Sequence, residues 1–457
     1  MQIRKALVLG MARSGVAAAK LLVSRGAEAY ICDRKTKEEL GDALDGLNVQ
    51  GVSWHLGEEH PERLLEGMDA LIISPGIPLT NPAAIKAKEM GVEVMGELEY
   101  AYRESTGLLM AVTGTNGKTT TCTLLGEMFK NAGKRVSVVG NIGAPFAAAA
   151  MDMKAGDSTV CEVSSFQLET IREFHPAISA ILNISEDHLN RHGTMENYIA
   201  LKERIFENQS GGDTVVLNWD DPITRDMAER VKCKVAWFSS RETVSSGAFV
   251  VDGTIMFGTK HNARPVCRVE EIFIPGEHNL RNALAASAMA MTAGIPAPVI
   301  RHTLRTFKGV EHRIEFTREL SGVKFFNDSK GTNVDSSIQA VKAMKAPTVM
   351  ILGGYDKHTD FMPLCREIVA SGWIRGAVLI GDTAAQIERQ LREAGFEQIV
   401  HGGYDFPQAI QTAFRMAEEG GNVLFSPSCA SFDMFHDYEE RGREFKRIVK
   451  DLEPKMD

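Results

Sequence analysis

Paired cysteines, a membrane-spanning run and a secretion signal are all missing from this sequence of 457 residues. Its seven cysteines are scattered and no two have CxxC spacing, so neither a zinc site nor a disulfide framework is indicated. Residues 1–15 hold no apolar signal core and no cleavage site. The uncharged stretch 282–300 contains Gly294, Pro296 and Pro298, which favours a buried helix followed by a loop over a membrane span. We therefore expect a protein of the reducing cytoplasm without a membrane span.

An excess of positive charge is also missing. The chain holds 51 lysines and arginines against 60 aspartates and glutamates, a formal charge of −9, so no global basic field favours nucleic acid. We expect no nucleic-acid partner, and any anionic ligand must be held by local devices such as helix N-termini, glycine turns and single cations. Hydrophobic residues are 44% and charged residues 24%, which excludes disorder and collagen-like repeats. The length suggests about three domains.

The first block, residues 1–104, has the pattern of βαβ units on a parallel sheet and predicts a Rossmann-like α/β domain. Its apolar runs at 6–9, 29–32 and 70–73 alternate with helical stretches at 15–25 and 82–90.

The second block, residues 105–308, predicts a central α/β domain. It opens with an apolar run at 107–113 that leads into a glycine turn and a helix at 121–131. Further strand-like and helix-like segments follow at 135–139, 158–163, 177–184, 278–292 and 299–307. From 235 to 274 the segments become short and alternating, with Asp252-Gly253 as a hairpin turn, which predicts a small antiparallel sheet attached to the parallel one.

The third block, residues 309–457, again alternates strands and helices and predicts a second Rossmann-like α/β domain. The expected elements are strands at 324–327, 348–352, 377–380 and 422–425 and a last helix at 433–450.

The strongest motif is Gly114-Thr-Asn-Gly-Lys-Thr-Thr120, which lies between an apolar strand and a helix, as a phosphate loop does. Backbone N–H groups and the helix N-terminus would cradle phosphates, Lys118 would reach the β and γ oxygens, and Thr119 would ligate Mg²⁺. The motif is shortened, because Val112 stands where the usual spacing has a glycine. A simple glycine turn before a helix is the alternative. We predict nucleoside triphosphate binding.

A phosphate loop needs a further acid for the metal or the nucleophile. Glu162 ends an apolar strand, at the carboxyl edge of the sheet where such residues lie, although alone it would be an ordinary strand-end carboxylate. His188 also follows an apolar strand and, as a neutral imidazole, could ligate a metal; a capping or core role is the alternative.

A second glycine turn, Gly10 to Gly15, follows the first strand. It lacks GxGxxG spacing, so a dehydrogenase is only weakly indicated. Asp33 follows the next strand, where such folds place an acid that contacts a ribose or base, and Ser74-Pro-Gly76 could approach a phosphate through backbone groups. Each of these segments is also an ordinary turn.

Taken together, these motifs resemble those of the Mur ligases, ATP-dependent amide-forming enzymes of peptidoglycan precursor synthesis. The resemblance spans all three blocks. In the first two blocks it rests on Ser74-Pro-Gly-Ile77, the Gly10–Gly15 loop, Gly114–Thr120, Glu162-Val-Ser-Ser-Phe-Gln-Leu168, Glu186-Asp-His188 and Gly276-Glu-His-Asn-Leu-Arg-Asn282. In the third block it rests on His312-Arg313, Asn327-Asp-Ser-Lys-Gly-Thr-Asn333, Gly353-Gly-Tyr-Asp-Lys357 and Ser426-Pro-Ser-Cys-Ala-Ser-Phe-Asp433. The third block narrows the resemblance to the branch that adds D-glutamate to UDP-N-acetylmuramoyl-L-alanine.

The resemblance implies three domains that hold the UDP group, ATP and the amino acid in turn. A substrate carboxylate would attack the γ-phosphate, and the amine of D-glutamate would then attack the acyl phosphate, releasing phosphate. The site must exclude water to protect that intermediate, so we expect domain closure. We also expect a monomer that uses Mg²⁺, with two ions.

The resemblance also assigns residues by position. For ATP it implies Gly114, Thr115, Asn116, Gly117, Lys118, Thr119, Thr120, Asn279, Asn282, Arg313 and Asp328, with Thr119, Glu162 and His188 at the metals. For the UDP-substrate it implies Ser14, Asp33, Arg34, Ser74, Pro75, Gly76 and Asn141, and at the reaction centre Lys330 and Thr332. For the amino acid it implies Thr332, Lys357, Ser431 and Tyr438, where the family carries phenylalanine at the last position.

Lys202 is the remaining position that the resemblance assigns. It implies a lysine carbamylated by CO₂, whose new carboxylate helps to place Mg²⁺. The pattern alone indicates an ordinary helix lysine. Carbamylation requires a neutral amine, and therefore a desolvated lysine with a depressed pKa.

Three alternatives stay open. A sibling ligase would share the ATP site and differ in the first and third domains, although the Asp-Asn-Pro-Arg pattern of the diamino-acid branch is missing. A nucleotide-driven switch would not need the first domain with its own glycine turn and Asp33. A dehydrogenase rests on Gly10–Gly15 and Asp33 alone. The related folylpolyglutamate synthase is disfavoured because it lacks the domain that precedes Gly107.

Overall fold

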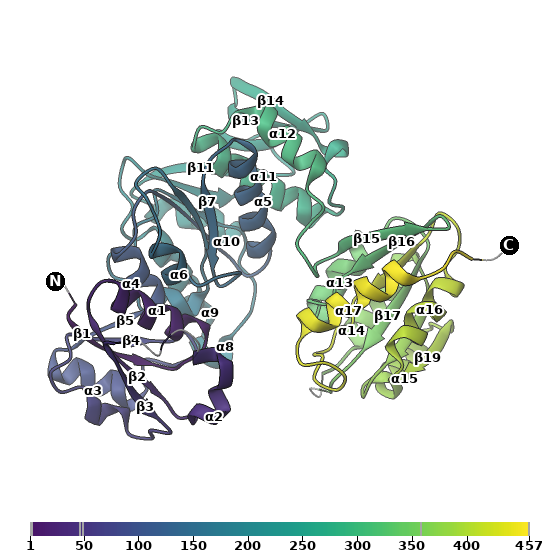
Figure 1. Cartoon of the computed structure of the whole chain (residues 1–457). Helices are drawn as coiled ribbons and strands as arrows, with labels where there is room; N and C mark the ends of the chain where they lie inside the picture. The colour runs from purple at the N-terminus through teal and green to yellow at the C-terminus, as the bar shows by residue number, and fades with distance from the viewer. Residues whose placement is uncertain (1–2, 45–46, 48–49, 357–358, 456–457) are drawn as a thin grey trace. The chain divides into compact units, whose positions relative to one another are not determined.

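The computed structural model describes residues 3–44, 47, 50–356 and 359–455, which form two compact units. One unit holds Met1–Glu271 and Arg281–Arg305, and the other holds Ile272–Leu280 and Thr306–Asp457. The first unit contains two β-sheets and the second contains one (Figure 1). Among these described residues, no helix is both long and apolar enough to cross a membrane.

The first sheet has five parallel strands in the order β3-β2-β1-β4-β5. The strands are β1 (Lys5–Leu9), β2 (Glu28–Asp33), β3 (Val52–Leu56), β4 (Ala70–Ile73) and β5 (Glu93–Gly96). The helices of this part are α1 (Arg13–Ser24), α2 (Lys37–Leu40), α3 (Pro82–Met90) and α4 (Glu97–Arg103). The strand order reverses between β1 and β4, and in such folds ligands bind at that point, beyond the carboxyl ends of the strands. The predicted Rossmann-like sheet is confirmed, with β3 and β5 added.

Helix α3 shows why some boundaries follow from sequence. Asn81 caps its first turn by accepting a hydrogen bond from the Ala83 N–H at 2.9 Å, and Pro82 occupies the first helical position. Gly91 ends the helix with φ 73°, a left-handed conformation that glycine adopts readily. The observed bounds therefore equal the predicted ones.

The second sheet has nine strands in the order β14-β13-β12-β11-β10-β9-β6-β8-β7. Its strands are β6 (Leu108–Thr113), β7 (Val136–Gly140), β8 (Ser158–Glu162), β9 (Ile178–Ile181), β10 (Thr214–Asn218), β11 (Lys234–Ser239), β12 (Ser246–Val251), β13 (Thr254–Thr259) and β14 (Asn262–Arg268). Its helices are α5 (Lys118–Asn131), α6 (Phe146–Ala150), α7 (Ser165–Leu168), α8 (Leu189–His192), α9 (Met195–Glu203), α10 (Pro222–Met227), α11 (Glu277–Thr292) and α12 (Ala297–Thr306).

The antiparallel strands of this region continue the main sheet. Strand β12 pairs in parallel with β11 and antiparallel with β13, so β12–β14 form its antiparallel edge. Asp252 and Gly253 have φ values of 46° and 70°, as a two-residue hairpin turn with right-handed strand twist requires. The stretch 282–300 holds the rest of α11, which ends at Thr292, then a short loop as predicted, and the start of α12 at Ala297.

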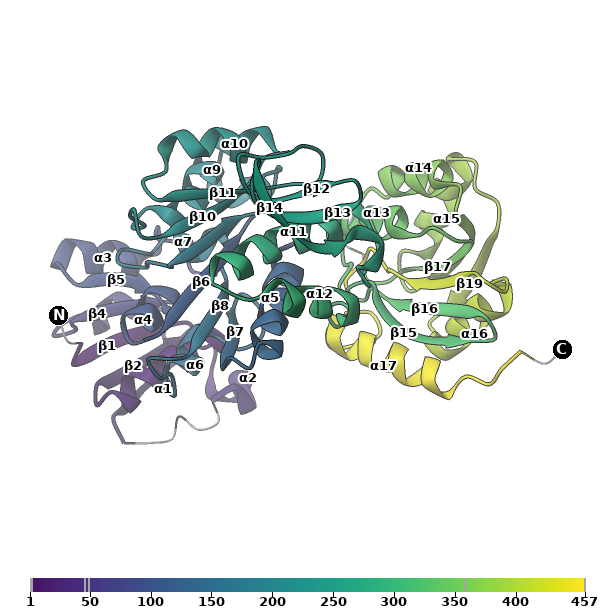
Figure 2. The ribbon, with the colours of Figure 1, turned by 90° about the horizontal axis from the view of Figure 1, so that it is seen from above.

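The third sheet lies in the second unit and has the order β15-β16-β20-β17-β18-β19, with β15 antiparallel to its neighbour. Its strands are β15 (Glu315–Leu320), β16 (Val323–Asn327), β17 (Thr348–Gly353), β18 (Ile374–Ile380), β19 (Ile399–Gly403) and β20 (Asn422–Phe425). Its helices are α13 (Val334–Ala343), α14 (Met362–Ser371), α15 (Ala384–Glu393), α16 (Phe406–Met416) and α17 (Tyr438–Asp451). Helices α13–α15 cover one face and α16 and α17 the other (Figure 2).

Helix α17 begins later than the sequence predicts. Residue 433 was the expected start, but the helix starts at Tyr438 because Asp437 is extended and its carboxylate accepts a hydrogen bond from the Glu440 N–H. Asp437 is therefore the N-cap, a role for which aspartate is well suited.

A buried carboxylate joins the first two sheets into one unit. Glu99 of α4 accepts hydrogen bonds from the backbone N–H groups of Arg172, Glu173 and Phe174 at 2.8–3.0 Å, and from Arg103 Nε at 2.8 Å. Four donors satisfy a carboxylate that is fully buried. The three sheets lie within residues 5–96, 108–268 and 315–425, and the predicted domain limits at 104 and 308 stay predictions.

Candidate active site

The phosphate-loop motif forms the turn between β6 and α5. Gly114 and Gly117 have φ values of 144° and 86°, which favour glycine. A Cβ on Gly117 would lie 2.3 Å from Asn282 Oδ1, so a side chain there would displace the Asn282 amide. Helix α5 begins at Lys118, so the backbone N–H groups of its first turn, which have no acceptor within the helix, face the loop. This is the strand–loop–helix geometry that phosphate binding requires.

Hydrogen bonds to the segment that follows β9 fix the conformation of the phosphate loop. The Thr115 N–H donates to Asn183 O at 2.9 Å, and the Asn116 N–H donates to Asn183 Oδ1 at 2.8 Å. Ser185 N–H in turn donates to Thr115 Oγ1 at 3.0 Å. Because these contacts bind the loop on one side, its conformation is set before any ligand arrives.

Lys118, the first residue of α5, folds back over the loop that precedes it. Its Nζ donates to Gly114 O at 2.9 Å and to Thr115 O at 2.8 Å, and the side chain is half-buried. The Lys118 ammonium therefore lies beside the loop, where it can replace its hydrogen bonds to these two carbonyls with hydrogen bonds to phosphate oxygens.

Three predicted residues meet at the carboxyl edge of the second sheet. Thr119 Oγ1 donates to Glu162 Oε2 at 2.9 Å, and Asn141 Nδ2 donates to Glu162 Oε1 at 3.0 Å. Thr119 and Glu162 are buried. A hydroxyl and a carboxylate beside a phosphate loop are the hard oxygen ligands that Mg²⁺ prefers, so these residues fit a metal–nucleotide site.

His188 has a different setting. It has φ 53° and is half-exposed, with Nε2 3.5 Å from Asp187 Oδ2, and its ring packs on Phe166. Within the described residues no three His, Cys, Asp or Glu side chains converge as a ready-made metal site. A metal role for His188 stays a prediction.

Lys202 of α9 is buried directly beneath the phosphate loop. Its Nζ donates to Gly114 O at 2.9 Å, is 3.5 Å from Thr113 Oγ1, and lies over the Tyr198 ring at 4.7 Å. Burial, reinforced by the Lys118 charge, lowers the pKa of Lys202 to about 6. The amine is therefore largely neutral at pH 7, which is the state that reacts with CO₂.

Tyr198 is a site residue that the sequence analysis missed. Its hydroxyl lies 3.2 Å from Thr115 Oγ1, and its ring stacks on His192 at 5.5 Å. His192 is buried and bonds to Ser165 through Nε2 at 3.0 Å. The sequence signal that could have found Tyr198 is its position one helical turn before Lys202.

The glycine turn of the first sheet is held by two of its predicted ligand residues. Asp33 Oδ2 accepts a hydrogen bond from the Met11 N–H at 2.6 Å, and Ser74 Oγ donates to Gly10 O at 2.8 Å. Both predicted residues thus shape the turn. Of the other predicted residues here, Arg34 and Gly76 are exposed and Ser14 and Pro75 are half-buried. Their UDP-substrate roles stay predictions.

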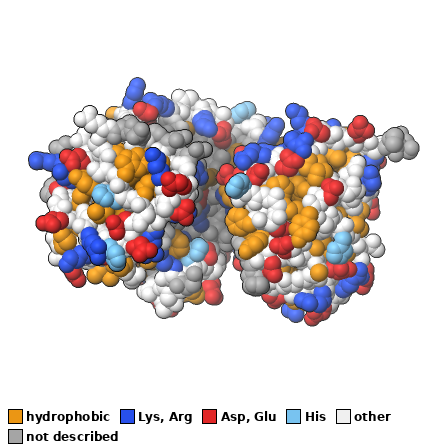
Figure 3. All heavy atoms as spheres, turned by 60° about the horizontal axis from the view of Figure 1, so that its bottom comes forward, with side chains coloured by type: hydrophobic (Ala, Val, Ile, Leu, Met, Phe, Trp, Pro, Cys, Tyr) orange, Lys and Arg blue, Asp and Glu red, His pale blue; other side chains and the backbone are white. Residues whose placement is uncertain are grey.

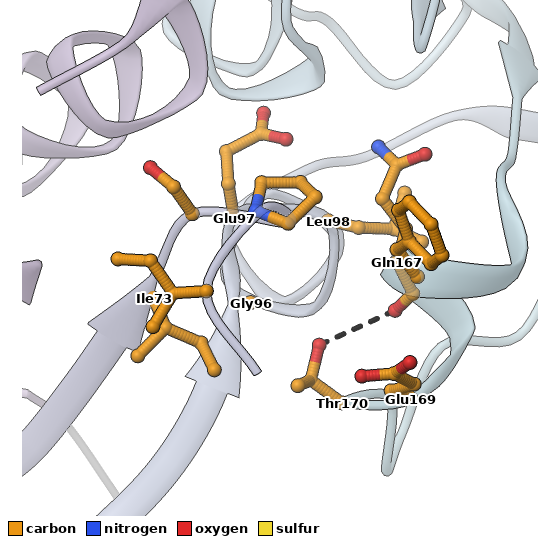
Figure 4. A pocket seen from close by; sticks show the side chains of 11 residues that line it. Ile73, Gly96, Glu97, Leu98, Gln167, Glu169 and Thr170 are labelled. Atoms are coloured by element: carbon orange, nitrogen blue, oxygen red, sulfur yellow. Dashed lines mark hydrogen bonds between the residues drawn. The ribbon is translucent and has the colours of Figure 1, made fainter. Parts of the chain in front are cut away.

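The two sheets of the first unit approach each other around a narrow pocket. Ser74, Pro75 and Ile77 line it from the first sheet and Phe166, Gln167, Glu169 and Thr170 from the second, with Gly96, Glu97 and Leu98 between them. Figure 4 shows Thr170 hydrogen-bonded to Gln167 below Glu97. Glu97 is 1% exposed, and Oε1 accepts a hydrogen bond from the Ala147 N–H of α6 at 2.6 Å. Oε2 has no hydrogen-bond partner among the described residues.

Glu97→Gln is expected to change how stability depends on pH. Burial raises the pKa of Glu97 to about 7, whereas the unfolded carboxyl titrates near 4.5. The stabilising contribution of the protonated form is complete below pH 4.5 and is lost as pH rises through 7. Glutamine stays neutral, so the free energy of unfolding of the variant should gain up to about 3 kcal/mol on wild type between pH 4.5 and 8.5. Urea denaturation at both pH values measures this gain; the exposed control Glu89→Gln should show none, and an unchanged difference for Glu97→Gln would refute it.

In the second unit, Asp328 anchors the loop that follows β16. Asp328 Oδ2 accepts from Ser426 Oγ at 2.7 Å and Oδ1 accepts from the Ile314 N–H at 3.1 Å. Burial raises the pKa of Asp328 to about 6. Arg313 lies next to Ile314 in the chain and has a buried Nε without a hydrogen-bond partner among the described residues. Asp328 thus holds the segment that carries Arg313, and the nucleotide contacts of both residues stay predictions.

Several residues predicted for the reaction centre and the amino-acid substrate belong to the loop that follows β16 or lie against it. Lys330 Nζ lies over the Tyr438 ring at 5.7 Å, and the Thr332 N–H donates to Lys330 O at 2.9 Å. Ser431 is buried. Lys357 lies outside the described residues. Asn279 is buried, with Nδ2 donating to Pro275 O at 2.7 Å, and Asn282 lies against Gly117; their adenine contacts stay predictions.

Arg441 of α17 is a second missed residue, and it ties these loops together. It has no exposed surface, and its guanidinium donates to Ser329 O, Cys429 O and Ala430 O at 2.9–3.0 Å and to Ser329 Oγ at 3.1 Å. Burial lowers the pKa of Arg441 to about 10, so it remains charged. Its partners are neutral groups on distant loops, so no local sequence pattern points to it.

Lysines and arginines are interspersed with aspartates and glutamates over the face that Figure 3 shows. This mixture agrees with the expectation that no global basic field exists. The positive groups among the predicted and newly found site residues are instead single and local: Lys118 in the first unit, and Arg313, Lys330 and Arg441 in the second. The threonine of the phosphate loop, Thr119, contacts the acid Glu162 at the carboxyl edge of a parallel sheet. This arrangement defines a P-loop enzyme that acts on a nucleoside triphosphate.

The chain belongs to the Mur ligase family of amide-forming ligases. Three family models match it in order: the MurD-like N-terminal domain over residues 4–96, the Mur ligase middle domain over 112–290, and the Mur ligase glutamate ligase domain over 312–429. The match confirms the three predicted domain types.

Individual relatives cover the whole chain. It is 48% identical over 451 residues to the UDP-N-acetylmuramoylalanine--D-glutamate ligase of Thermoanaerobacter pseudethanolicus, covering 98% of both chains. It is 41% identical to the enzyme of that name from Clostridioides difficile, over 98% of this chain and 99% of that one. Among solved structures, the UDP-N-acetylmuramate-alanine ligase of Thermotoga maritima superposes with a TM-score of 0.61 at 19% identity, covering 98% and 99% of the two chains. That likeness shows the shared fold.

Proposed function

We propose that this protein joins D-glutamate to UDP-N-acetylmuramoyl-L-alanine in an ATP-dependent reaction of peptidoglycan precursor synthesis. The observation that carries the proposal is the meeting of Thr119, Asn141 and Glu162 beside the Lys118 loop, with Lys202 buried beneath it. The near-full-length identity to D-glutamate ligases supports the choice of amino acid. The enzyme acts as a cytoplasmic monomer.

The chemistry follows from the weakness of a carboxylate as an acylating agent. Transfer of the γ-phosphoryl group to the carboxylate of the UDP-substrate forms an acyl phosphate, and ADP departs. The amine of D-glutamate then attacks the acyl carbon, phosphate leaves, and an amide remains. Lys118 stabilises the charge that develops on the transferring phosphoryl oxygens, and Asn141 orients the reacting end of the substrate.

The metal and the carbamate belong to the same proposal. When bound, Mg²⁺ would neutralise charge on the β and γ oxygens, and Thr119, Glu162 and His188 would hold it and a second ion. In the carbamylation step the neutral Lys202 amine attacks CO₂, an N–C bond forms, and one proton leaves for solvent. Thr113 Oγ1 and the Gly114 carbonyl orient the Lys202 side chain.

The proposal is tested by phosphate release with ATP, Mg²⁺ and UDP-N-acetylmuramoyl-L-alanine, with D-glutamate, L-glutamate, L-lysine and diaminopimelate offered in parallel. Release with D-glutamate alone, and a product of the expected mass, is the expected result. Release with a different amino acid would move the protein to a sibling activity. Hydrolysis of ATP that responds to no UDP-sugar would favour a nucleotide switch and overturn the proposal.

Arg441→Lys is expected to weaken binding of D-glutamate selectively. Lysine keeps the charge but cannot reach Ser329, Cys429 and Ala430 together, because an ammonium lacks the planar fork of a guanidinium. We expect the KM for D-glutamate to rise about tenfold or more, with the KM for ATP changed less than about twofold. Phe414→Leu, a core change on α16, is the matched control, since it lowers stability away from these loops. Equal KM values for D-glutamate in Arg441→Lys and wild type would contradict the prediction.

A further inference from the structure

Two strained residues flank Arg313 in the turn that precedes β15. His312 has φ 64° and Ile314 has φ 44°, in the left-handed region that a β-branched residue rarely occupies. Such strain persists only where the surroundings over-determine the conformation. Two side chains at the end of β16 join this turn to the rest of the unit: Asp328, which accepts from the Ile314 N–H, and Asn327, the last residue of β16, which has no exposed surface.

The orientation of the Asn327 amide is set by partners that cannot reverse their roles. Its Oδ1 accepts a hydrogen bond from the Ser329 N–H at 3.2 Å, and its Nδ2 donates to Gly442 O at 3.2 Å. A backbone N–H only donates and a carbonyl oxygen only accepts, so the oxygen and nitrogen of the amide cannot be exchanged. The two hydrogens of Nδ2 therefore face three acceptors and are shared among them: Gly442 O, His312 Nδ1 at 2.9 Å and Glu315 Oε2 at 3.1 Å.

This contact decides which nitrogen of His312 carries the proton. An amide NH₂ cannot accept, so Nδ1 must be the unprotonated nitrogen and Nε2 must carry the hydrogen. Glu315 Oε2 is 3.9 Å from Nδ1, beyond hydrogen-bond range, and already accepts from the His312 N–H and from Asn327 Nδ2. The other charged groups that face the ring are Glu311, Arg443 and Lys446; burial outweighs them and lowers the pKa of His312, which favours the neutral ring.

We propose that Asn327 is a positioning residue of the ligase reaction: it holds His312 as the neutral Nε2–H tautomer and keeps the strained turn 312–314 in the conformation that presents Arg313. The proposal rests on the proposed function and on the nucleotide contact that the family resemblance assigns to Arg313. His312 O accepts from the Lys330 N–H at 3.0 Å, and the ring meets Tyr438 edge-on at 6.2 Å. Asn327 thereby also supports the segments that carry Lys330 and Tyr438.

The tautomer is read directly by ¹⁵N NMR of protein labelled at histidine, with the His312 signals assigned by His312→Gln. We expect wild-type Nδ1 to show the chemical shift of an unprotonated nitrogen and Nε2 that of a protonated one. Asn327→Asp removes the donor and offers an acceptor, so Nδ1 should become protonated and the pKa of His312 should rise. A protonated Nδ1 in wild type would overturn the proposal, and this spectrum needs neither substrate nor variant of Asn327.

Kinetics supply the second arm. Asn327→Asp should lower kcat about tenfold or more and leave the KM for the UDP-substrate within about twofold, because the turn no longer holds Arg313. Asn422→Asp is the matched control, since Asn422 is a buried asparagine of the neighbouring strand β20 whose amide bonds to Thr348 Oγ1 at 3.1 Å. It should leave the His312 signals and kcat per folded molecule unchanged.

The outcomes separate this inference from the proposed function. Wild-type kcat in Asn327→Asp would overturn the positioning role, and equal losses in Asn327→Asp and Asn422→Asp would show a merely structural effect. Where Asn327→Asp does not fold, Asn327→Ala removes the donor without adding charge and carries the kinetic comparison. If wild type joins no amino acid at all, the proposed function fails while the NMR result still decides the tautomer.

Discussion

Lys118→Ala is expected to lower kcat for phosphate release by about a thousandfold, the size that follows from removing a cation from a phosphoryl-transfer transition state. Lys118 begins α5 and lies on the carbonyls of Gly114 and Thr115, where a triphosphate would replace them. The fold should tolerate the change, because the side chain is half-buried and its hydrogen bonds to Gly114 O and Thr115 O lie within the loop. The measurement is steady-state phosphate release at saturating ATP, D-glutamate and UDP-substrate, with circular dichroism to verify folding.

Lys130→Ala provides the matched control on the same helix. Lys130 is exposed and pairs with Glu127 at 2.7 Å, and a surface ion pair of this kind contributes little to stability. Its kcat and KM values should equal those of wild type. If Lys118→Ala kept more than about a tenth of wild-type kcat, the loop would not be the site of phosphoryl transfer.

Lys202→Ala is expected to lower kcat by about a hundredfold to a thousandfold, because it removes the side chain whose carbamate would help to hold Mg²⁺ beside the transferring phosphoryl group. If the active form is a carbamate, formate or acetate should restore part of the activity by occupying the space that the side chain leaves. Labelled ¹³CO₂ should give a carbamate NMR signal in wild type and none in the variant. Because the pKa of Lys202 is about 6, that signal and the activity should fall together as pH drops through 6 and the amine becomes protonated.

Lys202→Arg separates the carbamate from a role as a simple cation. Arginine places a permanent positive charge in the pocket beneath Gly114, and because it stays protonated it does not form a carbamate in this way. It should be as inactive as Lys202→Ala, and formate should not restore it because the pocket stays filled. Wild-type activity in Lys202→Ala, or recovery of activity in Lys202→Arg, would contradict carbamylation.

Several local features were predictable because their causes lie within a few residues. The apolar run of β6 and the glycine–lysine–threonine pattern place the phosphate loop, and Asn81, Pro82 and Gly91 set both ends of α3. The predicted start of α17 is wrong because several polar residues before the helix could cap it. Asp437 takes that role rather than Asp433. The predicted antiparallel strands attached to the parallel sheet are confirmed, and only the structure shows that the attachment is the pairing of β12 with β11.

Some features of the candidate site likewise follow from local sequence, whereas others depend on the tertiary structure. The sequence by itself determined the phosphate loop, the strand-end acid Glu162 and the order of the three domains, since the spacing of residues along one strand–turn–helix suffices for each. Only the tertiary structure decided that Lys202 is desolvated, that Asn141 and Thr119 share the Glu162 carboxylate, and that Asn327 and Arg441 hold loops together. The physical reason is that burial and hydrogen-bond partners are supplied by segments far away in the chain. Ser329 and Cys429, which Arg441 joins, are brought to its side only by the pairing of β16, β20 and β17.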